Sequence, residues 1–385
     1  MRVFMKQFFI FLTTVVILPV FNSSLASSHC GFFDTDCQDL QSLNPKMIVE
    51  HYNPDLAFNG TTLFGLNAKK NKSMAIIEVD MNGNIVWEYV VPTSIVKQSK
   101  YNGLMDVKRL SNGNTLFVMQ NSGIYEINAA GEVVWKHLDQ ATHDVDRLKN
   151  GNTIYLRGWA KKGESQVVEV DSTGNVVWQW DALEEYDVYP FSEVGTGGWI
   201  HPNSVTRLEN GNTLISLRNF DMLVEVDKAG KTVWSQKFLC EKRRTWRHRG
   251  VDGLYDDAYI EGCNPHEPEV QENGNILVTT RHPFTTYELT RDGRVVWEAD
   301  HRNVGFTSPR SRDVDRLLNG NTLIQVDNVL YELTHDKQIV WQLEFPEIPR
   351  FSPGKMRKKY ADEPKSFWKQ FKFKPLYRAQ RIAPK

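Results

Sequence analysis

Histidines and arginines occupy related positions in a pattern that returns along this chain of 385 residues. Each copy contains an Asn-Gly turn, and the residues seven positions before its Asn are Met105, His143, Asn203, His266 and Arg312. The residues eight positions after the same Asn are Gln120, Gly158, Arg218, Arg281 and Asp327. Imidazole can act as a nucleophile or a proton shuttle near neutral pH, and guanidinium groups hold carboxylate, phosphate or sulfate. These residue types predict a site for an oxyanion.

The candidate catalytic residues come from three consecutive copies of the pattern and are His143, His201 and His266. His201 lies two positions before Asn203, and side chains two apart on a strand share one face. We expect the substrate to be bound by Asn203, Arg218 and Arg281. For any single histidine, a hydrogen-bonded strand residue is the alternative interpretation.

Three histidines could instead bind a metal ion. The neighbouring guanidinium groups would repel a cation, so we expect neither a metal nor another cofactor at this site. The carboxylates with the best claim to a place beside the histidines are Glu267 and Glu269, which follow His266. The residue set therefore favours anion chemistry over metal chemistry.

The pattern that positions these residues occurs six times. Its turns are Asn59-Gly60, Asn112-Gly113, Asn150-Gly151, Asn210-Gly211, Asn273-Gly274 and Asn319-Gly320. Each copy ends in an apolar strand with a tryptophan, and these are Trp87, Trp135, Trp178, Trp234, Trp297 and Trp341. Asn-Gly favours a type I′ turn, because both residues tolerate positive φ. We expect the tryptophans to pack between neighbouring copies and not to bind a ligand.

Each copy is interpreted as four short antiparallel strands, as in the third copy at 144–148, 153–156, 167–171 and 175–178. Such units are typical of β-propeller blades, which bury their faces only against neighbouring blades. The sequence therefore predicts an all-β fold, a six-bladed β-propeller with four-stranded antiparallel blades over residues 45–345. The first strand of a blade is innermost, so we expect the three histidines to meet at one mouth of the central channel.

The first residues of the chain form a predicted signal peptide, 1–26. Arg2 and Lys6 precede an apolar run over 8–21, and small residues lead to Ala26. The run is short for a bilayer span of about 20 residues, and an uncleaved anchor is the alternative. We therefore expect an exported protein, periplasmic or secreted, with 27–44 as an N-terminal extension.

Export permits disulfide bonds. The four cysteines fall into two local pairs, Cys30 with Cys37 and Cys240 with Cys263, although four cysteines allow three connectivities. Zinc is disfavoured because no short C-x-x-C spacing is present. The arginine-rich segment 241–262 is either a basic lid that steers sulfated substrates or a solvated surface loop.

The composition indicates one large globular domain, with 41% hydrophobic residues and a formal net charge of -1. This near-neutral balance gives no reason to expect a nucleic-acid partner. Residues 346–385 form a basic, aromatic C-terminal tail, which we expect to pack its aromatic side chains on the propeller. Peripheral contact with anionic lipid is the alternative, so membrane contact would involve only this tail or the N-terminal segment.

The segment Trp199-Ile-His201-Pro-Asn203-Ser-Val205, followed by Leu214-Ile-Ser-Leu-Arg218-Asn219, resembles the His-x-Asn-Ser-Val and Ser-Arg-Asn core of bacterial arylsulfate sulfotransferases. The similarity extends over about residues 45–345. The resemblance implies a periplasmic six-bladed propeller. It also implies transfer of a sulfuryl group from an aryl sulfate ester to a phenol, without a nucleotide sulfate donor.

The resemblance also implies roles for individual residues. By order and repeat position, the transiently sulfated histidine is His266 and the family's first channel histidine is His143. The sulfate-holding group then consists of His201, Asn203 and Arg218. Two departures are the segment Glu267-Pro268-Glu269 after His266 and a chain too short for the family's large N-terminal domain. That domain contributes to dimerisation, so the oligomeric state stays open.

Two other functions fit the sequence. The first is a non-catalytic propeller that binds an anionic ligand or a protein partner, which would show ligand-induced stabilisation without turnover. The second is a quinone-dependent dehydrogenase, because Asp171-Ser-Thr-Gly174 followed by Trp178 is similar to quinoprotein repeats. Six copies instead of eight, and the lack of a convincing calcium-binding carboxylate cluster, count against the dehydrogenase.

Overall fold

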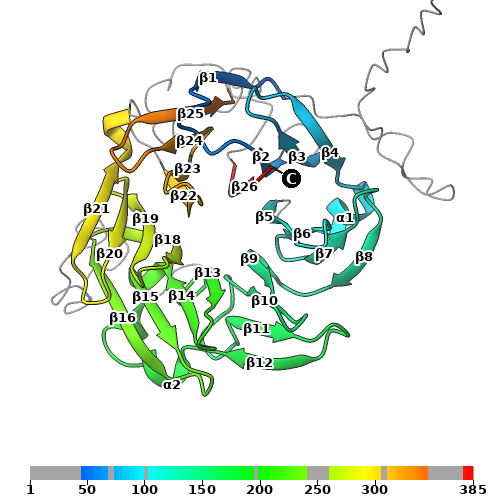
Figure 1. Ribbon diagram of the computed structural model, residues 1–385. Helices are drawn as coiled ribbons and strands as arrows, with labels where there is room; N and C mark the ends of the chain where they lie inside the picture. The colour runs from blue at the N-terminus through cyan, green and yellow to red at the C-terminus, as the bar shows by residue number, and fades with distance from the viewer. Residues whose placement is uncertain are drawn as a thin grey trace, which may run out of the picture.

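The computed structural model describes residues 45–67, 73–98, 103–194, 198–240, 260–304, 310–345 and 376–384. These residues form six sheets of mainly antiparallel strands, arranged as a ring (Figure 1). The inner strands of the six sheets face the axis of this ring, along which the sequence predicts the channel. The predicted all-β, six-bladed propeller is therefore confirmed. The predicted signal peptide, the Cys30–Cys37 pair and most of the predicted lid lie outside the described residues.

The strands of each blade are given from the inner to the outer edge. The first blade contains β26 (Ala379–Ile382), β2 (Thr61–Asn67), β3 (Met74–Val79) and β4 (Ile85–Val90). The second contains β5 (Leu104–Arg109), β6 (Thr115–Met119), β7 (Gly123–Ile127) and β8 (Val133–His137). The third contains β9 (Thr142–Arg147), β10 (Thr153–Leu156), β11 (Val167–Val170) and β12 (Val176–Trp180).

The fourth and sixth blades have a fifth strand. The fourth contains β13 (Pro202–Arg207), β14 (Thr213–Leu217), β15 (Met222–Val226), β16 (Thr232–Leu239) and β17 (Ile260–Glu261). The fifth contains β18 (Cys263–Val270), β19 (Ile276–His282), β20 (Thr285–Leu289) and β21 (Val295–Asp300). The sixth contains β22 (Ser311–Arg316), β23 (Thr322–Val326), β24 (Val329–Leu333), β25 (Ile339–Glu344) and β1 (Ile48–Tyr52).

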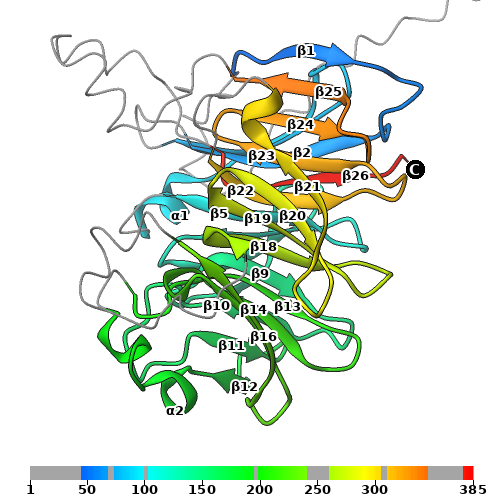
Figure 2. The same ribbon diagram turned by 90° about the vertical axis from the view of Figure 1, so that its left-hand side faces the viewer.

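The helices are short and follow or precede blade strands. They are α1 (Thr93–Gln98), α2 (Leu183–Tyr186) and the 3-10 helices η2 (Phe191–Glu193), η3 (Arg218–Phe220) and η4 (His301–Val304). In the side view, α1 and α2 lie on the same side of the ring (Figure 2). No helix in the described ranges is long and apolar enough to cross a membrane.

The Asn-Gly turns differ from the predicted type I′ geometry. In the second blade, Gly113 has φ +88° and donates its N–H to the carbonyl of Leu110, whereas Asn112 keeps a negative φ. This is the geometry of a type I turn followed by a left-handed glycine. The Asn112 side-chain oxygen accepts the N–H of Asn114, so the asparagine stabilises the turn through its side chain.

A clamp of tryptophan, arginine and glutamate joins each pair of neighbouring blades. Between the second and third blades, Trp135 donates its indole N–H to the carbonyl of Ser172 at 2.9 Å. The guanidinium of Arg147 lies 4.5 Å from the centre of the Trp135 ring and 2.6 Å from a carboxylate oxygen of Glu126. The clamp therefore combines a hydrogen bond, a cation–π contact and an ion pair.

The same clamp occurs at every blade junction. Its other members are Glu78–Arg109–Trp87, Glu169–Arg207–Trp178, Glu225–Arg291–Trp234, Glu288–Arg316–Trp297 and Glu332–Arg381–Trp341. In the fifth blade the inner strand has Val270 at the arginine position, and Arg291 from a later turn replaces it. The prediction that the repeated tryptophans pack between blades is confirmed.

The C-terminal end of the chain closes the ring. β26 pairs with β2 in antiparallel register, so that Ala379 faces Phe64 and Ile382 faces Thr61. Figure 1 shows β26 at the inner edge of the first blade. Arg381 of this strand forms the closing clamp, with its guanidinium 3.2 Å from Glu332 and 4.5 Å from the Trp341 ring centre.

This closure corrects the predicted boundary between propeller and tail. Residues 379–382 belong to the propeller, which therefore does not end at 345. The physical reason is that β1 pairs with β25 and becomes the outer strand of the sixth blade. Without β26, the first blade would leave the backbone groups of β2 unpaired at the channel edge.

Replacing Arg381 with methionine tests the closing clamp. Both Arg381 and Glu332 have fully buried side chains. The substitution leaves Glu332 without its cation, and we expect the free energy of unfolding to fall by about 3–5 kcal/mol. Urea denaturation followed by tryptophan fluorescence measures this loss. The matched control is Lys149→Met, which removes an exposed ion pair with Glu209 and should change stability little.

Candidate functional site

The closing strand supplies a sixth position to the inner ring of the channel. Arg381 faces Thr62 in the register in which Arg147 faces Thr153. The residues four positions before this point are Met105, His143, Asn203, His266 and Arg312 in five inner strands, and Tyr377 just before β26. Alignment of the repeats on their Asn-Gly turns did not identify Tyr377, because the inner strand of the first blade comes from the opposite end of the chain.

Two of the predicted histidines are in contact. The ring centres of His143 and His201 are 4.8 Å apart, and both residues are buried. Trp159 lies 4.4 Å from the ring centre of His201, and Tyr377 lies 5.7 Å from that of His143. The third and fourth blades and the segment before β26 therefore meet at one mouth of the channel.

The backbone at these two histidines is unusual. His143 has φ +61° and His201 has φ +49°, a left-handed conformation that residues other than glycine seldom adopt. Such residues are retained where the surrounding structure holds them in place, commonly at functional sites. The strained backbone at both positions therefore indicates that the placement of the two imidazole rings is what the surrounding structure maintains.

Hydrogen bonds hold the ring of His143. Its Nδ1 lies 2.8 Å from the hydroxyl oxygen of Thr142, and that oxygen also accepts the N–H of Gly158 at 2.7 Å. Burial, followed by the charges of Arg218 and Arg378, lowers the pKa of His143 to about 3. The imidazole is therefore neutral at physiological pH.

His266 has a defined tautomer. Its Nδ1 lies 2.7 Å from the carbonyl oxygen of Asn264, which can only accept, so Nδ1 carries the proton. The lone pair is then on Nε2. Burial, followed by the charges of Arg281 and Arg218, lowers the pKa of His266 well below 6.5. The structure thus holds a neutral imidazole whose lone pair is on Nε2.

Asn203 connects the other histidines to His266. Its side-chain N–H donates to the carbonyl of Pro265 at 3.0 Å, next to His266 in the chain. The buried Oδ1 of Asn203 has no hydrogen-bond partner among the described residues. The positive charge of Arg218 lowers the pKa of both His143 and His266, so Arg218 acts on both parts of the site.

The side chain of Asn264 anchors the start of β18 to η3, which carries Arg218. The guanidinium of Arg218 donates to the side-chain oxygen of Asn219 at 3.2 Å, and Asn219 in turn donates to the carbonyl of Gly198 at 2.7 Å. The side chain of Asn264 donates to the carbonyl of Arg218 at 3.1 Å. η3 and the start of β18 are therefore positioned together, and with them Arg218 and His266.

The Cys240–Cys263 disulfide lies at the same junction. The bond is formed, which confirms this predicted pair, and it joins the end of the fourth blade to the first residue of β18. Cys263 is three positions from His266. The disulfide therefore anchors the strand that carries the candidate nucleophile.

A buried layer of carboxylates lies one position further along the inner strands. Arg378 of the C-terminal segment binds it, with nitrogen–oxygen distances of 2.8 Å to Asp144 and 3.7 Å to Asp106 and an ion pair to Glu267. Arg378 also donates to the backbone carbonyl of Asn203 at 2.9 Å. Glu267, which departs from the expected family pattern, thus pairs with Arg378 beneath the histidines.

The predicted site residues therefore occupy one mouth of the channel, and the structure adds Tyr377, Arg378 and Trp159 to them. The sequence around Tyr377 and Arg378 does resemble an inner strand of the repeat. The segment Tyr377-Arg-Ala-Gln-Arg381-Ile matches the form of His143-Asp-Val-Asp-Arg147-Leu. Within the described part of the chain, no group of three or more His, Cys, Asp or Glu side chains is arranged to hold a metal ion.

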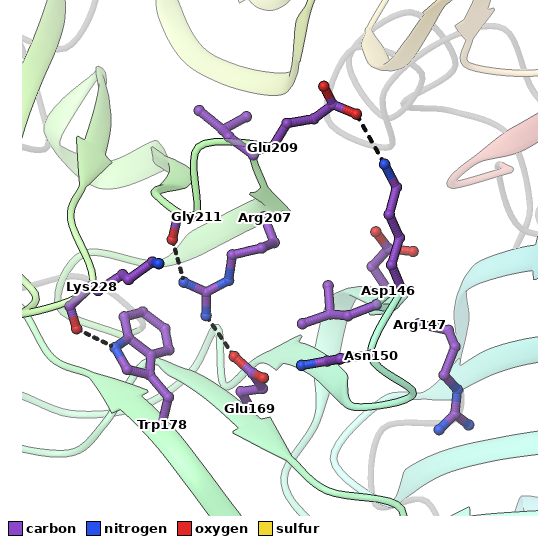
Figure 3. Close-up of a pocket in the computed structure, with 12 residues that line it drawn as sticks. Asp146, Arg147, Asn150, Glu169, Trp178, Arg207, Glu209, Gly211 and Lys228 are labelled. Carbon is purple, nitrogen blue, oxygen red and sulfur yellow. Dashed lines mark hydrogen bonds and ion pairs between the residues drawn. The ribbon is translucent and has the colours of Figure 1, made fainter.

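A cleft of about 850 Å³ at the opposite, turn-bearing mouth lies between the third and fourth blades (Figure 3). Its charged groups belong largely to the scaffold. Arg207 binds Glu169 at 2.6 Å, Lys149 binds Glu209 at 2.9 Å, and the indole of Trp178 donates to the carbonyl of Lys228 at 3.1 Å. The cleft is therefore a blade junction, separate from the histidine site.

Comparison with protein families identifies the group to which this architecture belongs. The family model described as Arylsulfotransferase (ASST) matches residues 42–249, more than half of the chain. The chain belongs to the arylsulfotransferase family. A second family model, described as outer membrane protein assembly factor BamB, matches residues 163–347. No curated protein matches this arylsulfotransferase-family chain.

One solved structure supports the fold of this family member. A Bacteroides caccae protein of unknown function is 18% identical, with a TM-score of 0.52, and the match covers 74% of this chain and 94% of that protein. A catalytically inactive virginiamycin B lyase from Staphylococcus aureus is 12% identical, with a TM-score of 0.46 and coverage of 76% and 87%. At these identities the first similarity concerns the propeller fold alone.

Replacing Gly158 with alanine tests how the site holds His143. A Cβ at this position would lie 2.4 Å from Nδ1 of His143 and 2.6 Å from the Thr142 hydroxyl. We expect the His143 ring to be displaced and the free energy of unfolding to fall by about 1–3 kcal/mol. Urea denaturation and a crystal structure of the variant provide the two measurements.

Gly103→Ala is the control, because its Cβ would meet only the flexible side chain of Gln120, at 3.1 Å. This variant should keep the wild-type stability and the 4.8 Å separation of the His143 and His201 ring centres. An unmoved His143 in the Gly158→Ala crystal structure would contradict the proposed packing constraint.

Proposed function

We propose that this protein transfers a sulfuryl group from an aryl sulfate ester to a phenol, with His266 as the nucleophile. Membership of the arylsulfotransferase family supports the reaction class. The observation that carries the role of His266 is the hydrogen bond from its Nδ1 to the Asn264 carbonyl, which leaves the Nε2 lone pair available.

In the first half-reaction, Nε2 of His266 attacks the sulfur atom of the aryl sulfate. The new N–S bond forms as the bond between sulfur and the aryl oxygen breaks, and the phenolate departs. Charge then redistributes over the sulfuryl oxygens, which we assign to Arg218, Asn203 and Arg281. Guanidinium and amide donors fixed before the reaction stabilise this charge without reorganising.

In this proposal the leaving oxygen receives a proton from a neighbouring imidazolium, which becomes a neutral imidazole. The low pKa of His143, about 3, keeps that residue neutral. We therefore assign proton transfer to His201, while His143 positions it through their ring contact. In this assignment His201 transfers the proton and His143 positions His201.

In the second half-reaction, the phenol oxygen attacks the sulfur atom of sulfohistidine. The N–S bond breaks, the new S–O bond forms, and His201 accepts the phenol proton. Nε2 of His266 regains its lone pair, so the protein returns to its starting state without any further reactant. Two half-reactions at one nucleophile predict ping-pong kinetics.

The proposed location is outside the cytoplasm, periplasmic or secreted. The N-terminal segment 1–26 supports this proposal through its basic start, apolar run and small-residue end. The Cys240–Cys263 disulfide is also compatible with an oxidising compartment. Residues 1–44 themselves lie outside the described structure.

A non-catalytic propeller that binds a partner is the second candidate. The observation in its favour is the match of residues 163–347 to the BamB family model, whose description names an assembly factor. This candidate predicts that aryl sulfates stabilise the fold without being converted. Sulfuryl transfer to a phenol would favour the sulfotransferase, and its absence would favour the non-catalytic propeller.

The His266→Ala variant tests the proposed nucleophile. With 4-nitrophenyl sulfate and phenol as substrates, we expect the rate of nitrophenol release to fall by about three orders of magnitude or more. The control is His335→Ala, an exposed histidine on a turn, which should keep wild-type turnover. Circular dichroism and thermal unfolding verify that both variants fold. Wild-type turnover in a folded His266→Ala variant would reject the role of His266.

The pH dependence of the first half-reaction tests the protonation state of His266. Its folded-state pKa lies well below 6.5, so the neutral nucleophile persists as the pH falls through 6.5. We expect the acid limb of the nitrophenol burst rate to lie below pH 6.5. Arg281→Gln should move this limb to higher pH, because it removes a positive charge that lowers the pKa. A wild-type midpoint at or above 6.5 would contradict this electrostatic environment.

A further inference from the structure

Three arginines at the mouth of the channel form a cluster that a single sulfate ester does not explain. Arg281 is on β19, and Arg310 and Arg312 stand just before and within β22, which packs against β19. A sulfate monoester carries one negative charge, and Arg218 already stands beside His266. The cluster therefore carries more positive charge than the binding of one sulfate monoester requires.

The pairing of arginines elsewhere in the fold makes this cluster exceptional. Every arginine of the interblade clamps has a glutamate oxygen between 2.5 and 3.2 Å away. By contrast, no carboxylate in the described ranges lies within 4 Å of the guanidinium groups of Arg281, Arg310 or Arg312. The fold neutralises its structural arginines and leaves these three for another anion.

The nearest contacts of the cluster do not supply that anion. Arg312 donates to the carbonyl of Leu376 at 3.5 Å, which is a long hydrogen bond. The buried Nε of Arg281 has no hydrogen-bond partner among the described residues. Asp327 accepts the backbone N–H of Arg310 at 3.4 Å, but it forms no ion pair with the three guanidiniums in the described structure.

The cluster adjoins the candidate nucleophile. Arg312 is at the position in the sixth blade that His266 occupies in the fifth. The charges of Arg281 and Arg312 both lower the pKa of His266, and those of Arg312 and Arg310 lower that of Arg281 after the larger effect of burial. An anion bound by the cluster would therefore lie beside the reacting sulfate.

We propose that Arg281, Arg310 and Arg312 form a second oxyanion subsite, which selects aryl substrates that carry a carboxylate or a further sulfate in addition to the transferred group. That the transferred group is a sulfate rests on the proposed function. Arg281 would thus contact both groups, whereas Arg310 and Arg312 would contact only the second. Planar guanidiniums match either oxyanion, and each desolvated contact strengthens binding.

Binding to an inactive variant tests this subsite without turnover. In the His266→Ala background, calorimetry would compare 4-carboxyphenyl sulfate and 1,4-phenylene disulfate with phenyl sulfate. We expect both dianions to bind about ten-fold or more tightly than phenyl sulfate. Arg310→Gln or Arg312→Gln, added to this background, should reduce the preference to about two-fold or less. Lysine at the same position should restore part of it, because it restores the charge.

Arg294→Gln, an exposed arginine on a distant turn, is the matched control and should keep the full preference. Thermal unfolding of each variant identifies any loss of fold, and Arg310→Gln provides a second test if Arg312→Gln unfolds. Equal affinities for dianions and phenyl sulfate, or a preference that survives both glutamine variants, would overturn the subsite. A preference that depends on Arg310 in a protein without sulfuryl transfer would support the subsite and reject the proposed function.

Discussion

The pairing of β26 with β2 is the constraint on which the rest of the structure depends. A propeller is a ring of sheets, and each sheet buries its faces only against its neighbours. The N-terminal strand β1 lies on the outside of the sixth blade, so the inner edge of the first blade is completed by the other end of the chain. The backbone ladder and the Arg381 clamp together close the ring.

The segment directly before β26 places two residues in the channel. Tyr377 lies at the level of the histidines, and Arg378 lies among the carboxylates beneath them. Burial raises the pKa of Asp313 to about 7 in this layer, whereas the charges of Arg378 and Lys108 overcome burial and lower that of Asp144 to about 2. Closure and electrostatic organisation of the site are therefore consequences of one insertion.

The channel has a polarity that follows from these layers. Guanidinium groups surround His266 at the mouth, and carboxylates surround Arg378 below it. An anion entering the mouth meets Arg281, Arg310 and Arg312, which form no ion pair with a carboxylate among the described residues, and the acidic layer opposes its movement further into the channel. This arrangement suits a substrate whose anionic group must stop beside the nucleophile.

Much of this organisation could be predicted from the repeat. The six Asn-Gly turns and six tryptophans indicated the number of blades, and alignment on the turns placed His143, His201 and His266 at one mouth. Alignment could not assign β26, because the strand is separated from its blade by almost the whole chain and its arginine follows a basic segment. The type I′ prediction was wrong because Asn112 satisfies the turn through its side chain, which a dipeptide rule does not consider.

The tautomer of His266 and its surroundings were also beyond the sequence. They depend on the carbonyl of Asn264, a residue with φ +54° whose conformation is stabilised by contacts from the fourth blade. Likewise, Val270 occupies the arginine position of the inner strand in the fifth blade, and Arg291 forms the clamp instead. Its role depends on the fold, which brings its turn beside Glu225 and Trp234 of the fourth blade. Spacing along a chain identifies which positions meet, but it does not identify which hydrogen bond orients a side chain once they do.

In the proposed mechanism, this channel brings one histidine nitrogen to the sulfur atom of an aryl sulfate. The most direct measurement is peptide mass spectrometry of the wild-type protein, quenched at alkaline pH after brief exposure to an aryl sulfate without an acceptor. We expect the added mass of one SO₃ group on the peptide that contains His266, and its disappearance when phenol is added. An adduct confined to another residue, or no adduct while nitrophenol is released, would contradict the proposed mechanism.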